Sequence, residues 1–332
     1  MSGNILQPLV DTLWNVPTAI RNIIHKLPEV VPYEIPNKEY RIGDISIPIG
    51  VTSKDVCYLN IDQRHVNVAV SGTTGFGKSN LINSIICSIT MLYPSTRLML
   101  IDGKAVELSQ YKSMSNVESF TYQLDNINTT INDIYQNILS TYEHMMQEGK
   151  RQISIYEPRH ITIIDEISLI DKKSIKILEK CMALGRACGY HFIICSQRLD
   201  ATSVITPVMR NLIDTNIVFK LDTNTSKLTI GTDEASVLSI QGRGIMKIGD
   251  IKVEFQSYYI TQEQINEVVK LNSNIKKKFK EKNVIATENT KVISINKKHK
   301  LQVSTVKCNE EEPKVNTEID SNTEIPDWVK TC

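Results

Sequence analysis

The chain has 332 residues, 41% of them hydrophobic, and a formal net charge of +1. This composition suits a globular protein with a sizeable core, and the near-neutral charge excludes nucleic-acid binding through a general basic field. No run of 18 apolar residues is present in the sequence, which argues against a transmembrane helix. The seven cysteines are scattered and predict reduced thiols, so we expect a cytoplasmic protein.

Three regions follow one another along the chain. Residues 1–44 begin with apolar side chains at near-helical spacing and predict a helical or irregular segment. This segment is expected to pack on the main domain or a neighbouring subunit, with peripheral membrane association as the alternative. Residues 45–271 are expected to form the main domain. Residues 272–332 segregate their charges, with nine Lys in 276–300 and six acidic side chains in 309–324, and predict a disordered tail.

The main domain alternates apolar runs with helical patterns, which predicts an α/β domain around a mainly parallel sheet. A small β-rich piece is expected at 45–63, and a hairpin turning at Gly249-Asp250 is expected within 242–260. The predicted core strands are 66–72, 97–102, 161–166, 191–197 and 216–221. The predicted helices lie near 78–92, 127–148, 172–187 and 203–213.

The stretch "SGTTGFGKSN" at 71–80 contains the full phosphate-loop pattern between a predicted strand and a predicted helix. Gly72, Gly75 and Gly77 permit the backbone angles that turn successive amides toward one anion, and the helix start adds its dipole. Lys78 is predicted to reach the β- and γ-phosphates of a nucleotide, and the Ser79 hydroxyl to bind Mg²⁺. The expected cofactors are therefore ATP and Mg²⁺.

Polar side chains are expected where later strands end. Asp165 and Glu166 follow the apolar run of "ITIIDE", which suits Asp165 to the metal shell and Glu166 to polarising the attacking water. Gln197 ends "HFIICSQ", a strand expected between the other two, where its amide could contact the γ-phosphate or the water. Arg186 closes the 172–187 helix. It is either an arginine finger for a neighbouring subunit or a helix C-terminal cation.

Several motifs in one order make residues 45–260 resemble the motor domain of the FtsK/SpoIIIE family of DNA translocases. They are "VAVSGTTGFGKSNLINSII", "LMLIDGKAVELSQY", "IIDEISLI", "GRACGYHFIICSQR", "VITPVMRNLIDTNIVFKL" and "QGRGIMKIG". Three departures stand out: Gly103 replaces a usual Pro, Ser196 replaces Thr, and Asn216 stands where the family often has Arg.

The resemblance implies a RecA-like P-loop NTPase fold of the ASCE class, working as a homo-oligomeric ring, usually hexameric, that hydrolyses ATP to move double-stranded DNA. It supports Arg186 as an intersubunit finger, alongside Asp165, Glu166 and Gln197 as site residues. Nucleotide-binding roles fall on Gly72, Thr73, Thr74, Gly75, Phe76, Gly77, Lys78, Ser79 and Asn80. A compact relative from a mobile element or phage is expected, serving plasmid, conjugative or phage DNA transfer with a membrane-associated or transfer-machinery protein partner.

DNA contacts are expected to be phosphate contacts from a few residues per subunit. The candidates are Arg198, Arg210, Lys227 and the basic cluster 276–282. Three alternatives remain open on the sequence: a motor for type VII protein secretion, a conjugative coupling protein, and an assembly protein that binds nucleotide without hydrolysing it.

Overall fold

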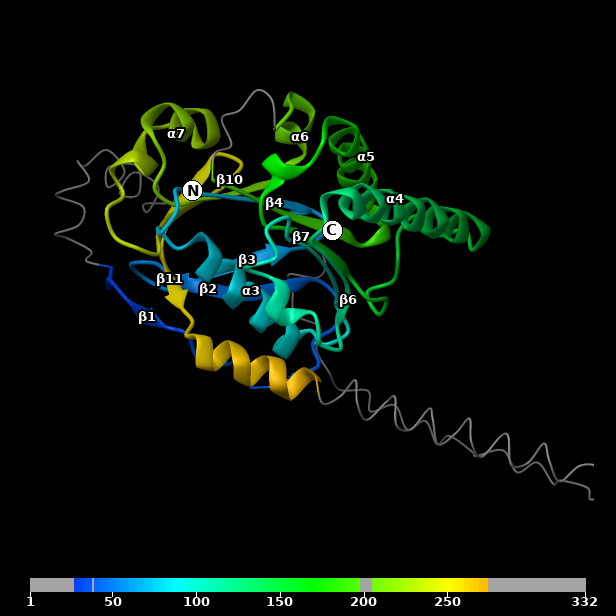
Figure 1. Ribbon diagram of the computed structural model, residues 1–332, viewed down its shortest axis with the longest axis horizontal. Coiled ribbons are helices and arrows are strands. Elements are labelled where there is room, and N and C mark those ends of the chain that lie inside the picture. The colour runs from blue at the N-terminus through cyan, green and yellow to red at the C-terminus, as the bar shows by residue number, and fades with distance from the viewer. Residues whose placement is uncertain (1–26, 38, 198–204, 274–332) are drawn as a thin grey trace, which may run out of the picture. The chain divides into compact units, whose positions relative to one another are not determined.

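The computed structural model describes residues 27–37, 39–197 and 205–273, and its sheet is central to the fold (Figure 1). The strand order is β3-β2-β11-β10-β9-β4-β8-β7-β5-β6, with β1 (Val31–Pro32) pairing β11. The parallel part contains β9 (Thr215–Val218), β4 (Asn67–Ser71), β8 (Tyr190–Ser196), β7 (His160–Ile164), β5 (Arg97–Ile101) and β6 (Val117–Thr121). The predicted α/β fold with a mainly parallel sheet is confirmed.

The position of β8 determines the site. It pairs in parallel with β4 on one side and with β7 on the other. The strand that ends next to Gln197 thus lies between the strand leading to the phosphate loop and the strand leading to Asp165, as the sequence predicts. Since parallel strands end at one edge of the sheet, all three deliver their following residues to the same place.

The strands β2, β3, β10 and β11 pair in antiparallel fashion. β10 (Arg243–Ile248) and β11 (Ile251–Tyr259) form the predicted hairpin, and β2 (Ile45–Val51) and β3 (Val56–Ile61) pair with each other. The β-rich piece expected at 45–63 is joined to the main sheet, because β2 pairs with β11. The hairpin therefore connects the amino-terminal strands to the parallel core.

Alternate residues of the core strands enter two separate apolar clusters, so the sheet is covered on both faces. Val68 and Val70 pack in the cluster that contains α3 (Lys78–Leu92), whereas Ala69 packs with α4 and α5. Helices α4 (Leu124–Gln147) and α5 (Lys172–Cys188) lie side by side on that second face (Figure 1). The short helices α6 (Pro207–Leu212) and α7 (Thr223–Ile230) flank β9 in sequence. The 3₁₀ segments are η1 (Ser109–Tyr111), η2 (Ile167–Leu169) and η3 (Glu234–Val237).

Several elements were not predicted, among them α7 and the two that follow. β6 is a partly exposed edge strand whose sequence, VESFT, lacks a long apolar run. A helix over 262–273 packs Ile265 and Val268 into the α3 cluster. Residues 1–26 of the predicted helical or irregular segment, Arg198 and the tail from 274 lie outside the described residues. Among the residues that are described, no helix is long and apolar enough to cross a membrane.

Candidate nucleotide-binding site

The phosphate loop connects β4 to α3 and depends on two glycines with positive φ. Gly75 has φ +85°, and Gly77, at the helix start, has φ +110°. A Cβ on Gly77 would also lie 2.9 Å from the Gly242 Cα. The first amides of α3 have no partner inside the helix, and no acidic residue occupies its first turn, so this terminus is suited to an anion.

The loop is held from outside by two other segments. Thr73 donates its amide to the Lys220 carbonyl at 2.9 Å. The Gln241 side chain donates to the Gly75 carbonyl at 2.9 Å, and the Gly242 amide donates to the Phe76 carbonyl at 3.1 Å. The segment after β9 and the residues before β10 therefore hold the loop in place without a ligand. Sequence analysis missed Gln241, although the "QGRG" stretch was among the family-like motifs.

A cavity of about 910 Å³ opens over the phosphate loop. It is large enough for a nucleotide. Of the predicted site residues, those that line the cavity are Thr73, Thr74, Gly75, Gly77, Lys78, Ser79, Asn80, Asp165 and Gln197. Gly72 and Phe76 belong to the loop but do not line the cavity. The side chain of Asn80 exchanges hydrogen bonds with the backbone of Ile260, so it also ties α3 to the chain after β11.

Glu166 lies beside the cavity and is 6% exposed. Its Oε2 is 3.9 Å from Lys78 Nζ and accepts a hydrogen bond from the backbone amide of Gln197 at 3.3 Å. Its Oε1 accepts the hydroxyl of Ser168 at 2.9 Å and that of Ser196 at 3.0 Å. The carboxylate is thus fully engaged by its own chain. The two serines were not predicted as site residues.

Asp165 is 5% exposed, and within the described residues its carboxylate accepts no hydrogen bond. Burial raises the pKa of this carboxyl, and the negative charges of Asp102 and Glu107 raise the pKa further, whereas Lys78 lowers it. A cation beside Asp165 would relieve the cost of burying its negative charge. Asp165 and Ser79 line one cavity, so this donor pair fits the predicted Mg²⁺.

The loop after β5 forms another wall of the cavity. The Asp102 carboxylate accepts the amides of Lys104 at 3.0 Å and Leu108 at 2.9 Å, which folds the loop so that Lys104 and Glu107 reach the cavity. A Cβ on Gly103 would lie 2.6 Å from Leu169 Cδ1. A larger residue at this position would require the Leu169 side chain to move.

Arg186 is not brought to this cavity. It is exposed in the last turn of α5, just before β8 begins at Tyr190. β8 has seven residues, which at about 3.3 Å per residue separates its two ends by roughly 20 Å. Arg186 therefore lies at the edge of the sheet opposite the phosphate loop of its own chain.

The predicted DNA contacts fall in different places. Arg210, on α6, lines a second cavity at the edge of the sheet opposite the phosphate loop. Lys227 is on α7, where its Nζ lies 3.7 Å from Asp233. Arg198 and the cluster 276–282 lie outside the described residues.

Residues 33–171 match the FtsK/SpoIIIE family. Proteins named DNA translocase FtsK are 26% identical over 276 residues in Staphylococcus aureus, covering 73% of this chain and 34% of the relative. The corresponding protein of Caldanaerobacter subterraneus is 28% identical over 224 residues, covering 61% of this chain and 31% of the relative. The chain thus spans about a third of the length of these curated relatives.

Solved structures share the fold. The conjugation coupling protein TcpA of pCW3, with ATPγS, has a TM-score of 0.63 at 21% identity, covering 74% of this chain and 75% of that chain. EssC ATPases 2 and 3 of Geobacillus thermodenitrificans have a TM-score of 0.64 at 18% identity, covering 76% of this chain and 52% of that chain. Residues 33–171, which contain the phosphate loop and the acidic strand end on one sheet edge, are thus similar to the FtsK/SpoIIIE family, and these matches support an ATPase.

Proposed function

We propose that this chain is an ATP-dependent translocase of double-stranded DNA that works as a homo-oligomeric ring, hexameric as is usual in the family. The observation that carries the proposal is the meeting of Lys78, Asp165 and Glu166 at one end of the sheet, beside a nucleotide-sized cavity. The name of the curated relatives, DNA translocase, supports DNA as the cargo. Transfer of plasmid, conjugative or phage DNA is the role we propose for it.

The phosphates of ATP are proposed to lie on the amides of residues 73–79, with the Lys78 ammonium against the β- and γ-phosphates. Ser79 and Asp165 would hold Mg²⁺, which supplies positive charge against the phosphate oxygens. The rigid attachment of the loop to Lys220 and Gln241 supports this assignment, because a preorganised site spends less binding energy on ordering itself.

Glu166 is proposed to orient the attacking water and accept its proton, with the Gln197 side chain as a second polar contact. In the structure the Glu166 carboxylate is 3.9 Å from Lys78 and is held by hydroxyl groups. It must exchange at least one of these contacts for the water before it can act as a base. The resting contacts therefore favour low turnover until the site rearranges.

Arg186 is proposed to complete the site of a neighbouring subunit. Its place at the far edge of the sheet, roughly 20 Å along β8 from its own phosphate loop, makes action within one chain impossible for a side chain of its length. A guanidinium supplied across an interface would make hydrolysis depend on ring assembly. An arginine finger contributes about 10³–10⁵ in rate in proteins where it has been measured.

ATP turnover with and without linear duplex DNA, together with mass measurement in each nucleotide state, tests the proposed cargo and the ring. We expect DNA to stimulate turnover and ATP to favour the oligomer. Turnover that ignores DNA would contradict translocation and favour the alternative motor for protein secretion.

A mixing experiment tests Arg186 separately. Lys78→Ala and Arg186→Ala subunits are each expected to be inactive, and mixed rings are expected to regain turnover where an intact phosphate loop meets an intact Arg186. Mixtures that stay inactive, although mass measurement shows mixed rings, would contradict action across the interface.

A further inference from the structure

A second cavity, of about 480 Å³, lies at the edge of the sheet opposite the phosphate loop. Three cationic side chains from separate segments line it: Arg64 from the loop before β4, Arg210 from α6, and Lys247 from the end of β10. We refer to this group as the basic cavity. The segments meet because β10 runs antiparallel to β9, so the end of β10 lies beside the start of β9.

The positive charge of the basic cavity is not neutralised by its own walls. Asp214 is the acidic residue among its lining residues, and its Oδ2 accepts the amides of Val66 at 2.9 Å and Asn67 at 3.2 Å. Within the described ranges, the side chains of Arg64, Arg210 and Lys247 form no hydrogen bond or ion pair. The cavity is therefore suited to an anionic ligand.

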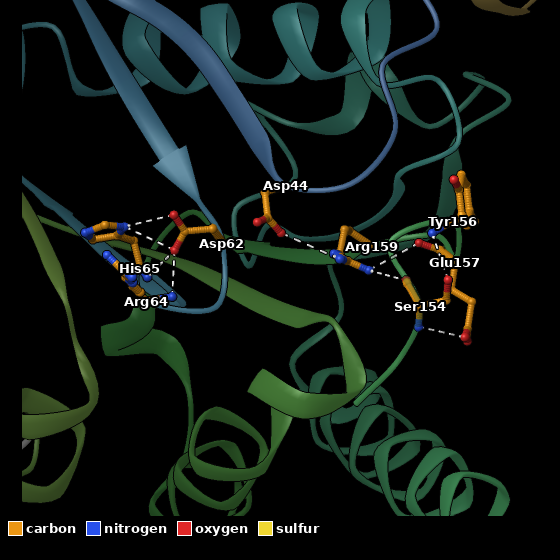
Figure 2. A network of polar contacts seen from close by, with 8 residues as sticks. All are labelled: Asp44, Asp62, Arg64, His65, Ser154, Tyr156, Glu157 and Arg159. Atoms are coloured by element: carbon orange, nitrogen blue, oxygen red, sulfur yellow. Dashed lines mark hydrogen bonds and ion pairs between the residues drawn. The ribbon is translucent and has the colours of Figure 1, made fainter. Parts of the chain in front are cut away.

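The loop that carries Arg64 is fixed by another acid. The Asp62 carboxylate accepts the backbone amides of Arg64 at 2.6 Å and His65 at 2.8 Å, and it contacts the His65 ring at 3.1 Å (Figure 2). These bonds order the backbone without engaging the Arg64 guanidinium. The loop presents Arg64 on an ordered turn, with its charge available to a ligand.

Lys247 stands directly opposite Asn216 in the β9–β10 ladder. Directly opposed residues of an antiparallel pair project on the same face of the sheet, and both of these line the basic cavity. Asn216 is uncharged and adds no charge to the basic cavity. Lys247, on the neighbouring strand, therefore places a positive charge in the part of the basic cavity that Asn216 also lines.

We propose that Arg64, Arg210 and Lys247 bind the phosphates of duplex DNA, with Lys247 supplying the charge that Asn216 lacks. This inference rests on the proposed function and names the contact surface for its cargo. Arg64 and Arg210 are exposed, and the three cations come from separate segments, which suits the spaced phosphates of a backbone better than one enclosed ion. Contacts of this kind read no base sequence.

The experiment measures binding of a labelled blunt duplex over a range of salt concentrations. Each lost phosphate contact is expected to weaken binding and to reduce the slope of log affinity against log salt by about 1. We therefore expect Lys247→Asn and Arg64→Gln each to weaken binding and reduce the slope. Adding Asn216→Arg to the Lys247→Asn variant is expected to restore both the affinity and the slope. Lys176→Asn is the matched control, because Lys176 is exposed on α5 and lines neither cavity.

The outcomes separate the inference from the proposed function. One outcome is that the unaltered chain binds duplex DNA and responds to it while Lys247→Asn has the same duplex affinity and salt slope as Lys176→Asn. In that case the basic cavity is not the contact surface. If the unaltered chain ignores DNA, the proposed function fails and the inference with it. Saturable binding of inorganic phosphate that Lys247→Asn removes, with duplex binding unchanged, would identify a free-anion site and overturn the inference alone.

Discussion

The Ser196 hydroxyl donates a 3.0 Å hydrogen bond to Oε1 of Glu166. Ser196 ends β8, and Glu166 follows β7, so the bond joins the ends of two adjacent strands. It occupies an oxygen of the carboxylate that is proposed as the catalytic base. We infer that this contact stabilises the resting form of the site.

Ser196→Ala is therefore expected to raise ATP turnover in the absence of DNA. A hydrogen bond to a charged group contributes about 1.5–3 kcal/mol, and because Ser168 still holds Oε1 we expect roughly a tenfold increase at most. Steady-state turnover is the measurement. Ser196→Thr keeps the hydroxyl and should behave like the unaltered chain. A fall in turnover for Ser196→Ala would show that the hydroxyl assists the reaction.

Glu166→Gln is expected to lower turnover by about 10²–10⁴-fold, because the amide cannot accept a proton from water. ATP binding should persist, since the phosphate loop is unchanged. Calorimetry with magnesium measures the affinity, and Lys78→Ala, which should lose both binding and turnover, is the comparison. If the ATP turnover rate is unchanged in Glu166→Gln, Glu166 is not the catalytic base.

Gly77→Ala is expected to abolish ATP binding and to destabilise the fold. Its φ of +110° is unfavourable for a side chain, at roughly 1–3 kcal/mol, and the new Cβ would lie 2.9 Å from Gly242 Cα. Gly231→Ala is the matched control, because Gly231 also has positive φ, +82°, but open space around it. Thermal unfolding and nucleotide titration compare the two variants. Equal effects of both substitutions would contradict the close contact with Gly242.

Arg243→Ala is expected to cost about 3–5 kcal/mol of unfolding free energy, the range for breaking a buried ion pair. Arg243 is 4% exposed, pairs with Glu254 at 3.2 Å, and donates to the carbonyls of Leu27 and Pro28. It thus fixes the segment at 27–30, part of which lines the nucleotide cavity.

Urea unfolding measures the effect of Arg243→Ala. Arg41→Ala is the comparison, because the Arg41–Glu39 pair is exposed and should contribute about 0–1 kcal/mol. Similar losses for the two variants would contradict a structural role for Arg243.

Stability is expected to fall below about pH 6.5 because of His191. Burial, and to a lesser extent the charge of Arg159, lowers the pKa of His191 to about 4 from an ordinary 6.5. The unfolded chain then binds a proton that the folded chain does not, so falling pH favours unfolding, with a cost of about 2 kcal/mol near pH 5. The loss should level off below about pH 4, where both states are protonated.

Urea midpoints at neutral and acid pH test the assignment to His191. His191→Phe should reduce the difference between them, whereas His144→Gln should not, because His144 is 70% exposed. An unchanged pH dependence in His191→Phe would assign the effect to other groups, such as His160, whose pKa burial also lowers.

Local features of the fold were predictable from the sequence. The phosphate loop requires a few consecutive residues with particular backbone angles, and Gly75 and Gly77 permit those angles whatever surrounds them, although Lys220, Gln241 and Gly242 then hold the loop in place. The core strands were predictable because both faces are buried, which requires continuous apolar runs. β6 was not predicted because it is a partly exposed edge strand. The helix over 262–273 was not predicted because it is short and largely polar.

The sequence by itself determined that this chain has a phosphate loop followed by an apolar strand ending in two acids, because both are contiguous patterns. Only the tertiary structure decided which side chains engage Glu166, why Arg186 is far from its own phosphate loop, and which cations share the basic cavity. Those relationships depend on strand order and on register, such as Lys247 opposite Asn216. Strand order and register arise from packing between residues far apart in the chain, which no local pattern encodes.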